Sequence, residues 1–175
     1  GQGERTPEGN ARAKERAMGI YDAIHKTLKE NADQAELALT PADAYSIEKL
    51  GKRAIFIGME NGYPVGTDLT LIQKYYDLGA RYITICHTRN NDICDSSNDS
   101  TEHHGLSQFG EKVVAEMNRI GMMIDVSHSS DETFYDVISL SKAPIIASHS
   151  CARALCDNPR NLSDDMLKKL AENGG

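Results

Sequence analysis

The sequence has no apolar run approaching the roughly 20 residues that a membrane-spanning helix needs, and residues 1–6 carry no signal-like apolar stretch. It also lacks an excess of basic residues, since 19 Lys and Arg stand against 26 Asp and Glu and give a net charge of −7. The basic residues are scattered, whereas a nucleic-acid backbone requires a clustered cationic surface. We therefore expect no membrane span in this segment and no nucleic-acid partner.

Cysteine is also sparse. The four cysteines, Cys86, Cys94, Cys151 and Cys156, form no Cys-x-x-Cys pair and are too few for a disulfide scaffold. We expect ordinary thiols. The alternatives are a Cys86–Cys94 or Cys151–Cys156 disulfide or a metal-binding role, and the cellular compartment stays open.

The remaining composition is that of an ordinary globular protein. The 175 residues are 39% hydrophobic and 26% charged, with 14 Gly and 5 Pro spread along the chain. This excludes a disordered or fibrous protein and matches about one domain of roughly 100–200 residues. An enzyme or a binding domain remains.

Short apolar runs alternate with amphipathic segments along the chain. The runs typical of strands are 53–58, which has the composition of a strand buried on both faces, 81–86, 122–126 and 144–148. The segments typical of helices are 11–30, 41–50 after a Thr40 cap, 69–78, 108–120 after a Ser107 cap, 130–140 with a Ser129–Glu132 capping box, and 163–172. Such alternation predicts βαβ units, hence an α/β fold with parallel strands.

A side chain that can ionise or bind metal follows each expected strand: Glu60, His87, His128 and His149. The carboxyl ends of parallel strands share one rim, so we expect these side chains to converge. Zinc accepts imidazole nitrogen and carboxylate oxygen, and it lowers the pKa of a bound water to about 7, which yields a hydroxide nucleophile. The pattern predicts a metal site for hydrolysis, in which Glu60 could bridge two ions.

Structural roles are the alternative for each of these residues, because a single Glu or His at a strand end more often makes a cap or a salt bridge. No His-Glu-x-x-His, P-loop, Gly-x-Ser-x-Gly or Gly-x-Gly-x-x-Gly motif decides the matter. Asp125 either orients a metal ligand or makes a structural hydrogen bond. Arg153 and Arg160 either bind an anionic substrate group or are solvated surface charges. The polar loop 90–104 is either functional or mobile.

Four segments resemble the renal (membrane) dipeptidase family of zinc metallopeptidases: Gly105–Gly110, Ile124–Ser129, Ala143–Ser150 and Arg160–Leu162. The resemblance extends over nearly the whole chain. It implies a (β/α)8 TIM-type barrel with two Zn²⁺ ions per complete site, which hydrolyses dipeptides and in some members dehydropeptides or β-lactams. A homodimer is also compatible with the resemblance.

The resemblance also implies a role for each matching residue. Glu60 would bridge the two zinc ions, and His128 and His149 would ligate one of them. His87 would contact the scissile carbonyl or its tetrahedral intermediate, and Arg160 would bind the substrate carboxylate.

Two features depart from the family pattern. The family takes a His-x-Asp pair from its first strand and an acidic residue from its last strand, whereas this sequence has no His-x-Asp and about four βα units. We therefore expect residues 1–175 to form a single incomplete metallopeptidase barrel domain, inactive alone and active within a longer parent protein. Asn61 stands where the family commonly has glycine, which concerns the shape of the loop after Glu60.

The leading hypothesis is thus a zinc-dependent dipeptidase that uses a metal-bound hydroxide. The alternative is a metal-free, non-catalytic barrel that acts as a binding or scaffold protein. A third option is a related hydrolase of another amide or ester.

Overall fold

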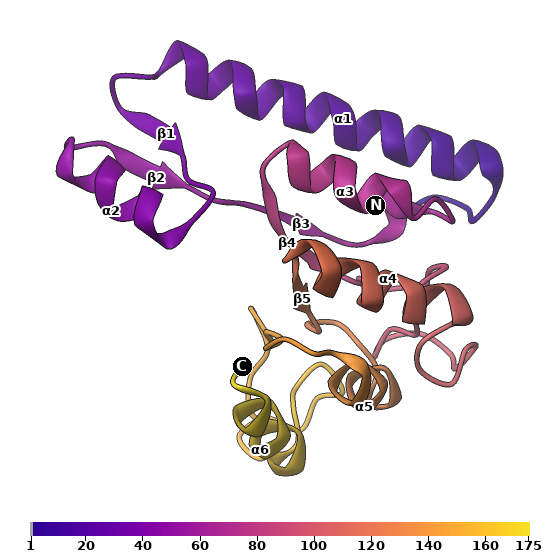
Figure 1. The fold of residues 1–175 in the computed structure, drawn as a ribbon. Helices are drawn as coiled ribbons and strands as arrows, with labels where there is room; N and C mark the ends of the chain where they lie inside the picture. Colours follow the sequence, from indigo (N-terminus) through magenta and orange to yellow (C-terminus); the bar gives the residue numbers. More distant parts are fainter. Residues whose placement is uncertain (1) are drawn as a thin grey trace.

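The computed structural model describes residues 2–175 as alternating helices and short strands (Figure 1). The helices are α1 (Pro7–Glu30), α2 (Pro41–Lys49), the 3-10 helix η1 (Tyr63–Val65), α3 (Thr70–Asp77), α4 (Gln108–Ile120), α5 (Asp131–Leu140) and α6 (Asp164–Asn173). The strands are β1 (Ala35–Leu37), β2 (Arg53–Ile55), β3 (Ile57–Glu60), β4 (Ala80–Thr84) and β5 (Met123–Asp125).

All strand pairs are parallel. The central sheet has the order β3-β4-β5, and β1 pairs with β2 in a separate two-stranded sheet. Figure 1 shows this small sheet with α2 at one end of the long helix α1, away from β5. Helical crossovers between parallel strands confirm the predicted α/β class.

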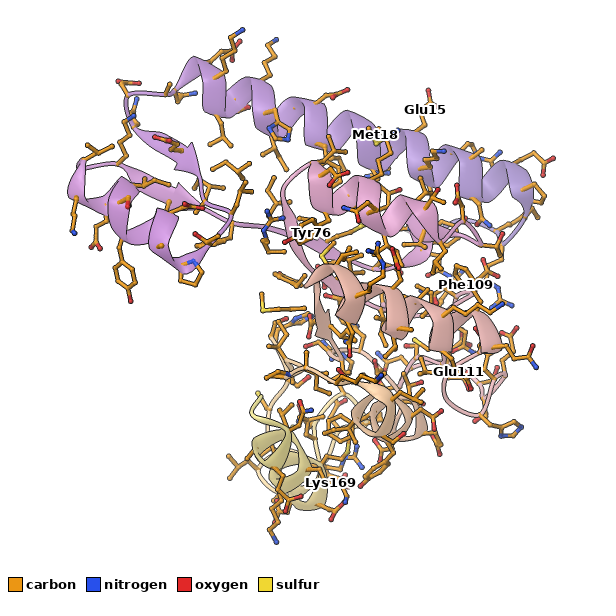
Figure 2. The ribbon with its side chains drawn as sticks, in the orientation of Figure 1. Glu15, Met18, Tyr76, Phe109, Glu111 and Lys169 are labelled. Atoms are coloured by element: carbon orange, nitrogen blue, oxygen red, sulfur yellow. The ribbon has the colours of Figure 1, made fainter. Side chains whose placement is uncertain are left out.

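Helices α3, α4 and α5 form a row in which neighbours touch, with α3 against β4, α4 against β5, and α6 beside α5 (Figure 1). Their apolar faces enclose the core, in which Tyr75, Ile83 and Phe134 are fully buried. Figure 2 shows Glu15 on α1 pointing away from the molecule, whereas Met18 on the same helix packs against the core. This core fixes the strand ends on which the site is built.

Most predicted helix ends are confirmed. Thr40 caps α2 with a capping box completed by Asp43, and Ser107 caps α4, which ends at Gly121 in the left-handed conformation. The predicted cap of α5 is wrong by one residue. The oxygen that accepts from the Thr133 N–H belongs to Ser130, at 3.1 Å, and Ser129 instead turns back so that its N–H bonds to a carbonyl of the preceding segment.

The run 53–58 is two strands rather than the single buried strand predicted. Arg53–Ile55 pairs with β1, and Ile57–Glu60 pairs with β4. Phe56 lies between them and is 48% exposed. The chain leaves one sheet and enters the other at this residue, so β2 is only partly buried.

The predicted strand 144–148 is reduced to a single parallel bridge between Ile146 and Asp125. Pro144 has no N–H to donate. The N–H groups of Ser148 and His149 bond instead to the side chains of Asp125 and Ser127, at 3.0 and 3.1 Å. Side chains thus replace the continuing ladder just where the chain reaches the site.

All four cysteines are free thiols, with Cys86 and Cys94 buried and Cys151 and Cys156 exposed. Within residues 2–175, no helix combines the length and the apolar character needed to cross a membrane. A cavity of about 490 Å³ lies between α1 and β3 and reaches Glu60 and His87. Tyr21 lines it, and burial raises the pKa of its hydroxyl to about 12.

Candidate metal centre

One row of paired residues in the sheet sets the position of the site. The members of this row are Glu60, Thr84, Asp125 and Ile146. A histidine follows each of the last three at the same offset of three residues, namely His87, His128 and His149. Equal offsets from one row bring the histidines to one end of the sheet, beside the carboxylate at the end of β3.

The four side chains converge on one carboxylate oxygen. Glu60 Oε1 lies 3.2 Å from His128 Nε2, 3.3 Å from His149 Nε2 and 3.4 Å from His87 Nε2. The ring centroids of His87 and His128 are 4.1 Å apart, and those of His128 and His149 are 5.0 Å apart. The structure therefore brings together all four residues that the sequence placed at strand ends.

His128 lies at the centre of this group and is 7% exposed. Burial, followed by the nearby charges of Arg160 and His87, lowers its pKa to about 4. Its Nδ1 is buried without a hydrogen-bond partner among residues 2–175. A neutral imidazole is the form that ligates metal, and this environment keeps the His128 ring neutral at neutral pH.

The loop after Glu60 has the backbone shape that glycine favours. Asn61 has φ of +93°, in the region that few other residues adopt. Its Oδ1 accepts from the Tyr63 N–H at 3.0 Å and from Asn91 Nδ2 at 3.3 Å. Asn61 thus adopts the positive φ that glycine, the residue common at this position in the family, would adopt easily.

Asp125 is fully buried behind the histidines. Its Oδ2 accepts from Thr84 Oγ1 and Ser148 Oγ, each at 2.6 Å, and its Oδ1 accepts from the N–H groups of Ser127 and Ser148, each at 3.0 Å. Burial acts to raise the pKa of this carboxyl, but the hydrogen bonds from Ser148 and Thr84 outweigh it and the pKa is lowered. The carboxylate joins β4, β5 and the segment before His149.

The sequence analysis left the role of Asp125 open and missed Ser127 and Ser148. A signal was present, because Ser-His occurs twice, at 127–128 and 148–149. The hydroxyl of Ser148 donates to the Asp125 carboxylate, and the hydroxyl oxygen of Ser127 accepts from the N–H of His149.

The two candidate arginines differ. Arg153 makes a two-pronged ion pair with Asp131, at 2.8 and 2.6 Å, so it is engaged within the protein. Arg160 is half-buried, and its Nη1 is buried with no hydrogen-bond partner in the described part of the chain. Its charge also lowers the pKa of His128, so it lies within electrostatic reach of the site.

The loop 90–104 is ordered and supports the site. The carboxylate of Asp95, which is 2% exposed, accepts from the N–H groups of Glu102, His103 and Gly105 at 3.0–3.3 Å. The next residue, Ser96, donates its hydroxyl to the carbonyl of His87 at 2.5 Å. Ser97 donates its N–H to the carbonyl of His128 at 2.8 Å.

These residues fit a zinc ion. One ligand atom each from Glu60, His128 and His149 lies within 4.8 Å of the others. Two imidazoles and a carboxylate are a donor set of catalytic zinc sites. Three ligand groups packed this closely, one of them an imidazole held neutral by burial, form a group that a divalent cation would stabilise.

Comparisons with known proteins agree with this arrangement. A profile of the family described as membrane dipeptidase (peptidase family M19) matches residues 4–175. The chain is 41% identical over 159 residues to Dipeptidase verJ of Clonostachys rogersoniana, covering 90% of this chain and 41% of that protein.

Two solved structures are also similar. The probable dipeptidase PvdM from Pseudomonas aeruginosa gives a TM-score of 0.92 at 36% identity, covering 97% of this chain and 44% of that one. A metallo peptidase from Rhodobacter sphaeroides, liganded with a phosphinate mimic of the dipeptide L-Ala-D-Ala, gives 0.79 at 29% identity, covering 87% and 46%. The chain thus spans less than half of each of these relatives. Together these matches confirm a partial TIM-type barrel.

Proposed function

Because this chain belongs to the membrane dipeptidase family, peptidase family M19, we propose that it carries the zinc-binding and substrate-orienting residues of a dipeptidase. The reaction is hydrolysis of the peptide bond of a dipeptide. Residues 1–175 are then one incomplete barrel domain, and the activity belongs to the full-length protein.

Glu60, His128 and His149 are the zinc ligands in this proposal. His128 and His149 would ligate one ion, and the Glu60 carboxylate would contribute to that ion and to a second one. A zinc ion bound here would supply Lewis acidity, lowering the pKa of a water to about 7 and polarising a carbonyl. The ligands come from β3 and from two loops, so the intact sheet is what holds them in register.

His87 and Arg160 orient the substrate. His87 Nε2 lies 3.4 Å from Glu60 Oε1 on a side chain that is 39% exposed, so it can donate a hydrogen bond to the scissile carbonyl oxygen beside the ligands. Arg160 has a guanidinium nitrogen without a partner in the described residues, and a carboxylate is the group that guanidinium binds best. A substrate with a free carboxylate near its scissile bond satisfies both contacts.

A single observation carries the proposal: one oxygen of Glu60 lies within 3.2–3.4 Å of three imidazole nitrogens from three different segments. If the site were only a cluster of structural hydrogen bonds, the burial of His128 Nδ1 without a hydrogen-bond partner in the described residues would have no explanation. A metal ligand explains why the imidazole is kept neutral and aimed at the carboxylate.

The test measures bound metal and dipeptide hydrolysis in the full-length protein. The wild type should bind zinc and hydrolyse dipeptides, and it should hydrolyse the C-terminal amide of the same dipeptide more slowly, because Arg160 loses its anionic partner. Glu60→Gln should lower kcat/KM by at least about 100-fold and reduce bound zinc, because an amide is a much poorer zinc ligand.

Glu15→Gln is the matched control. It makes the same chemical change on the exposed face of α1 and should leave both measurements unchanged. A full-length protein that folds but binds no zinc would instead support the metal-free scaffold. Zinc binding with hydrolysis of other amides or esters and not of dipeptides would support the related hydrolase.

A further inference from the structure

The hydrogen bonds around Asp125 determine which nitrogen of His149 carries the proton. The Asp125 carboxylate accepts from four donors, two hydroxyls on Oδ2 and two backbone N–H groups on Oδ1. The two backbone groups can only donate. With both oxygens accepting, the hydroxyl of Ser148 directs its single hydrogen to Asp125 at 2.6 Å.

The same Ser148 oxygen lies 2.7 Å from His149 Nδ1. Because its hydrogen is already committed to Asp125, Ser148 can only accept in this second contact. His149 therefore carries its hydrogen on Nδ1. In the neutral ring Nε2 then has the free lone pair, and this is the nitrogen that lies 3.3 Å from Glu60 Oε1.

We propose that Ser148 is a positioning residue, which uses Asp125 to hold His149 in the tautomer that presents Nε2 to the metal. The inference rests on the proposed function for its purpose, although the tautomer itself is a property of the metal-free chain. His149 is 41% exposed at its side chain, so packing alone does not fix the ring. His128 differs, because its Nδ1 has no partner in the part of the chain that the structure describes.

Thr84 offers a matched control. Its hydroxyl donates to the same Asp125 oxygen at the same distance of 2.6 Å, but within residues 2–175 its side chain makes no hydrogen bond to His149. Thr84→Val and Ser148→Ala therefore each remove one hydroxyl from Asp125. Only Ser148→Ala also removes the acceptor for His149 Nδ1.

The experiment measures the ¹⁵N chemical shifts of the His149 ring in the metal-free, full-length protein above pH 7. Wild type and Thr84→Val should show the Nδ1-H tautomer, and Ser148→Ala should show a mixture with Nε2-H. Zinc Kd, measured by competition with a chelator, should rise about 10–100-fold in Ser148→Ala and less than about threefold in Thr84→Val. Ser148→Thr keeps the hydroxyl and should restore both values.

The inference is overturned if His149 has the same tautomer in wild type and Ser148→Ala, or if Thr84→Val shifts it equally. Should Ser148→Ala fail to fold by circular dichroism, Ser148→Cys provides the weaker acceptor at similar volume and should give a partial shift. If the wild type binds no zinc, the proposed function fails, and the tautomer measurement still decides the role of Ser148.

Discussion

His128 has three energetically unfavourable features. It adopts φ of +72°, its Nδ1 is buried without a partner among residues 2–175, and its pKa is lowered to about 4 by burial and by the nearby charges of Arg160 and His87. Strain and unpaired polar groups of this kind concentrate at functional sites, because the surrounding structure enforces them. The residue is thus held in place by the fold rather than by its own preferences.

The lowered pKa predicts how stability depends on pH in the metal-free protein. In the unfolded chain an ordinary histidine takes up a proton near pH 6.5, whereas folded His128 stays neutral down to about pH 4. The unfolded state therefore binds more protons in this window, and stability is lost as the pH falls from about 6.5 to about 4.

Urea denaturation of the chelator-treated, full-length protein at several pH values between 7 and 4 measures this effect. His128→Asn should weaken the dependence, because asparagine does not titrate and tolerates a positive φ. Equal pH dependence in the two proteins would show that other groups cause it.

The sequence alone predicted that Glu60 and the three histidines lie together, but it did not predict the hydrogen bonds behind them. Glu60 and the histidines each follow an apolar run, which is a local signal. The contact between Ser148 and Asp125 depends on which residues face each other across the sheet. The sequence offers no signal that separates Arg153 from Arg160, because the ion pair of Arg153 with Asp131 forms only in the folded chain. Such pairings are set by register and packing, which composition does not encode.

At the scale of elements, loop 90–104 shows how one carboxylate orders a polar segment. Asp95 satisfies three backbone N–H groups, and the loop in turn contacts the carbonyls of His87 and His128. Asp95→Asn replaces one accepting oxygen with an NH₂ group that faces donors. We expect the free energy of unfolding to fall by about 1–3 kcal/mol.

Denaturant unfolding of the full-length protein measures this change. Asp92→Asn is the control, since this carboxylate lies in the same loop and has no side-chain hydrogen bond in the described structure. A loss of stability in Asp92→Asn as large as in Asp95→Asn would mean that loop charge, not the backbone contacts, is responsible.

Elements with strong local signals were predicted well, and the others were not. Helix α4 has a serine cap, an apolar face and a terminal glycine, so its bounds follow from neighbouring residues. The break at Phe56 has no such signal, because the same apolar run serves two sheets. The three-residue strand β1 is also too short for alternation to appear, and it was missed.

At the scale of the whole molecule, the candidate ligands belong to segments that are far apart in sequence and meet only in the folded chain. Glu60 and His149 are separated by two complete βα units and part of a third. The unfolded chain cannot present them together, so zinc should bind the folded state preferentially and stabilise it. At a free zinc concentration 100 times Kd, the gain is about 2.7 kcal/mol.

Chemical denaturation of the full-length protein in zinc and in a chelator measures this gain directly. Glu60→Gln should lose most of it, because the carboxylate that joins the histidines is gone, and Glu15→Gln should keep it. The same gain in Glu60→Gln as in wild type would show that Glu60 is not needed to bind the stabilising ion, because either the histidines alone hold it or it binds at another site. The candidate ligands are positioned by the row of paired residues that runs through Thr84 and Asp125, so the same experiment tests whether β3, β4 and β5 unfold together. If they form one cooperative unit, zinc should raise the denaturation midpoint equally when unfolding is followed by far-ultraviolet circular dichroism and by tyrosine fluorescence.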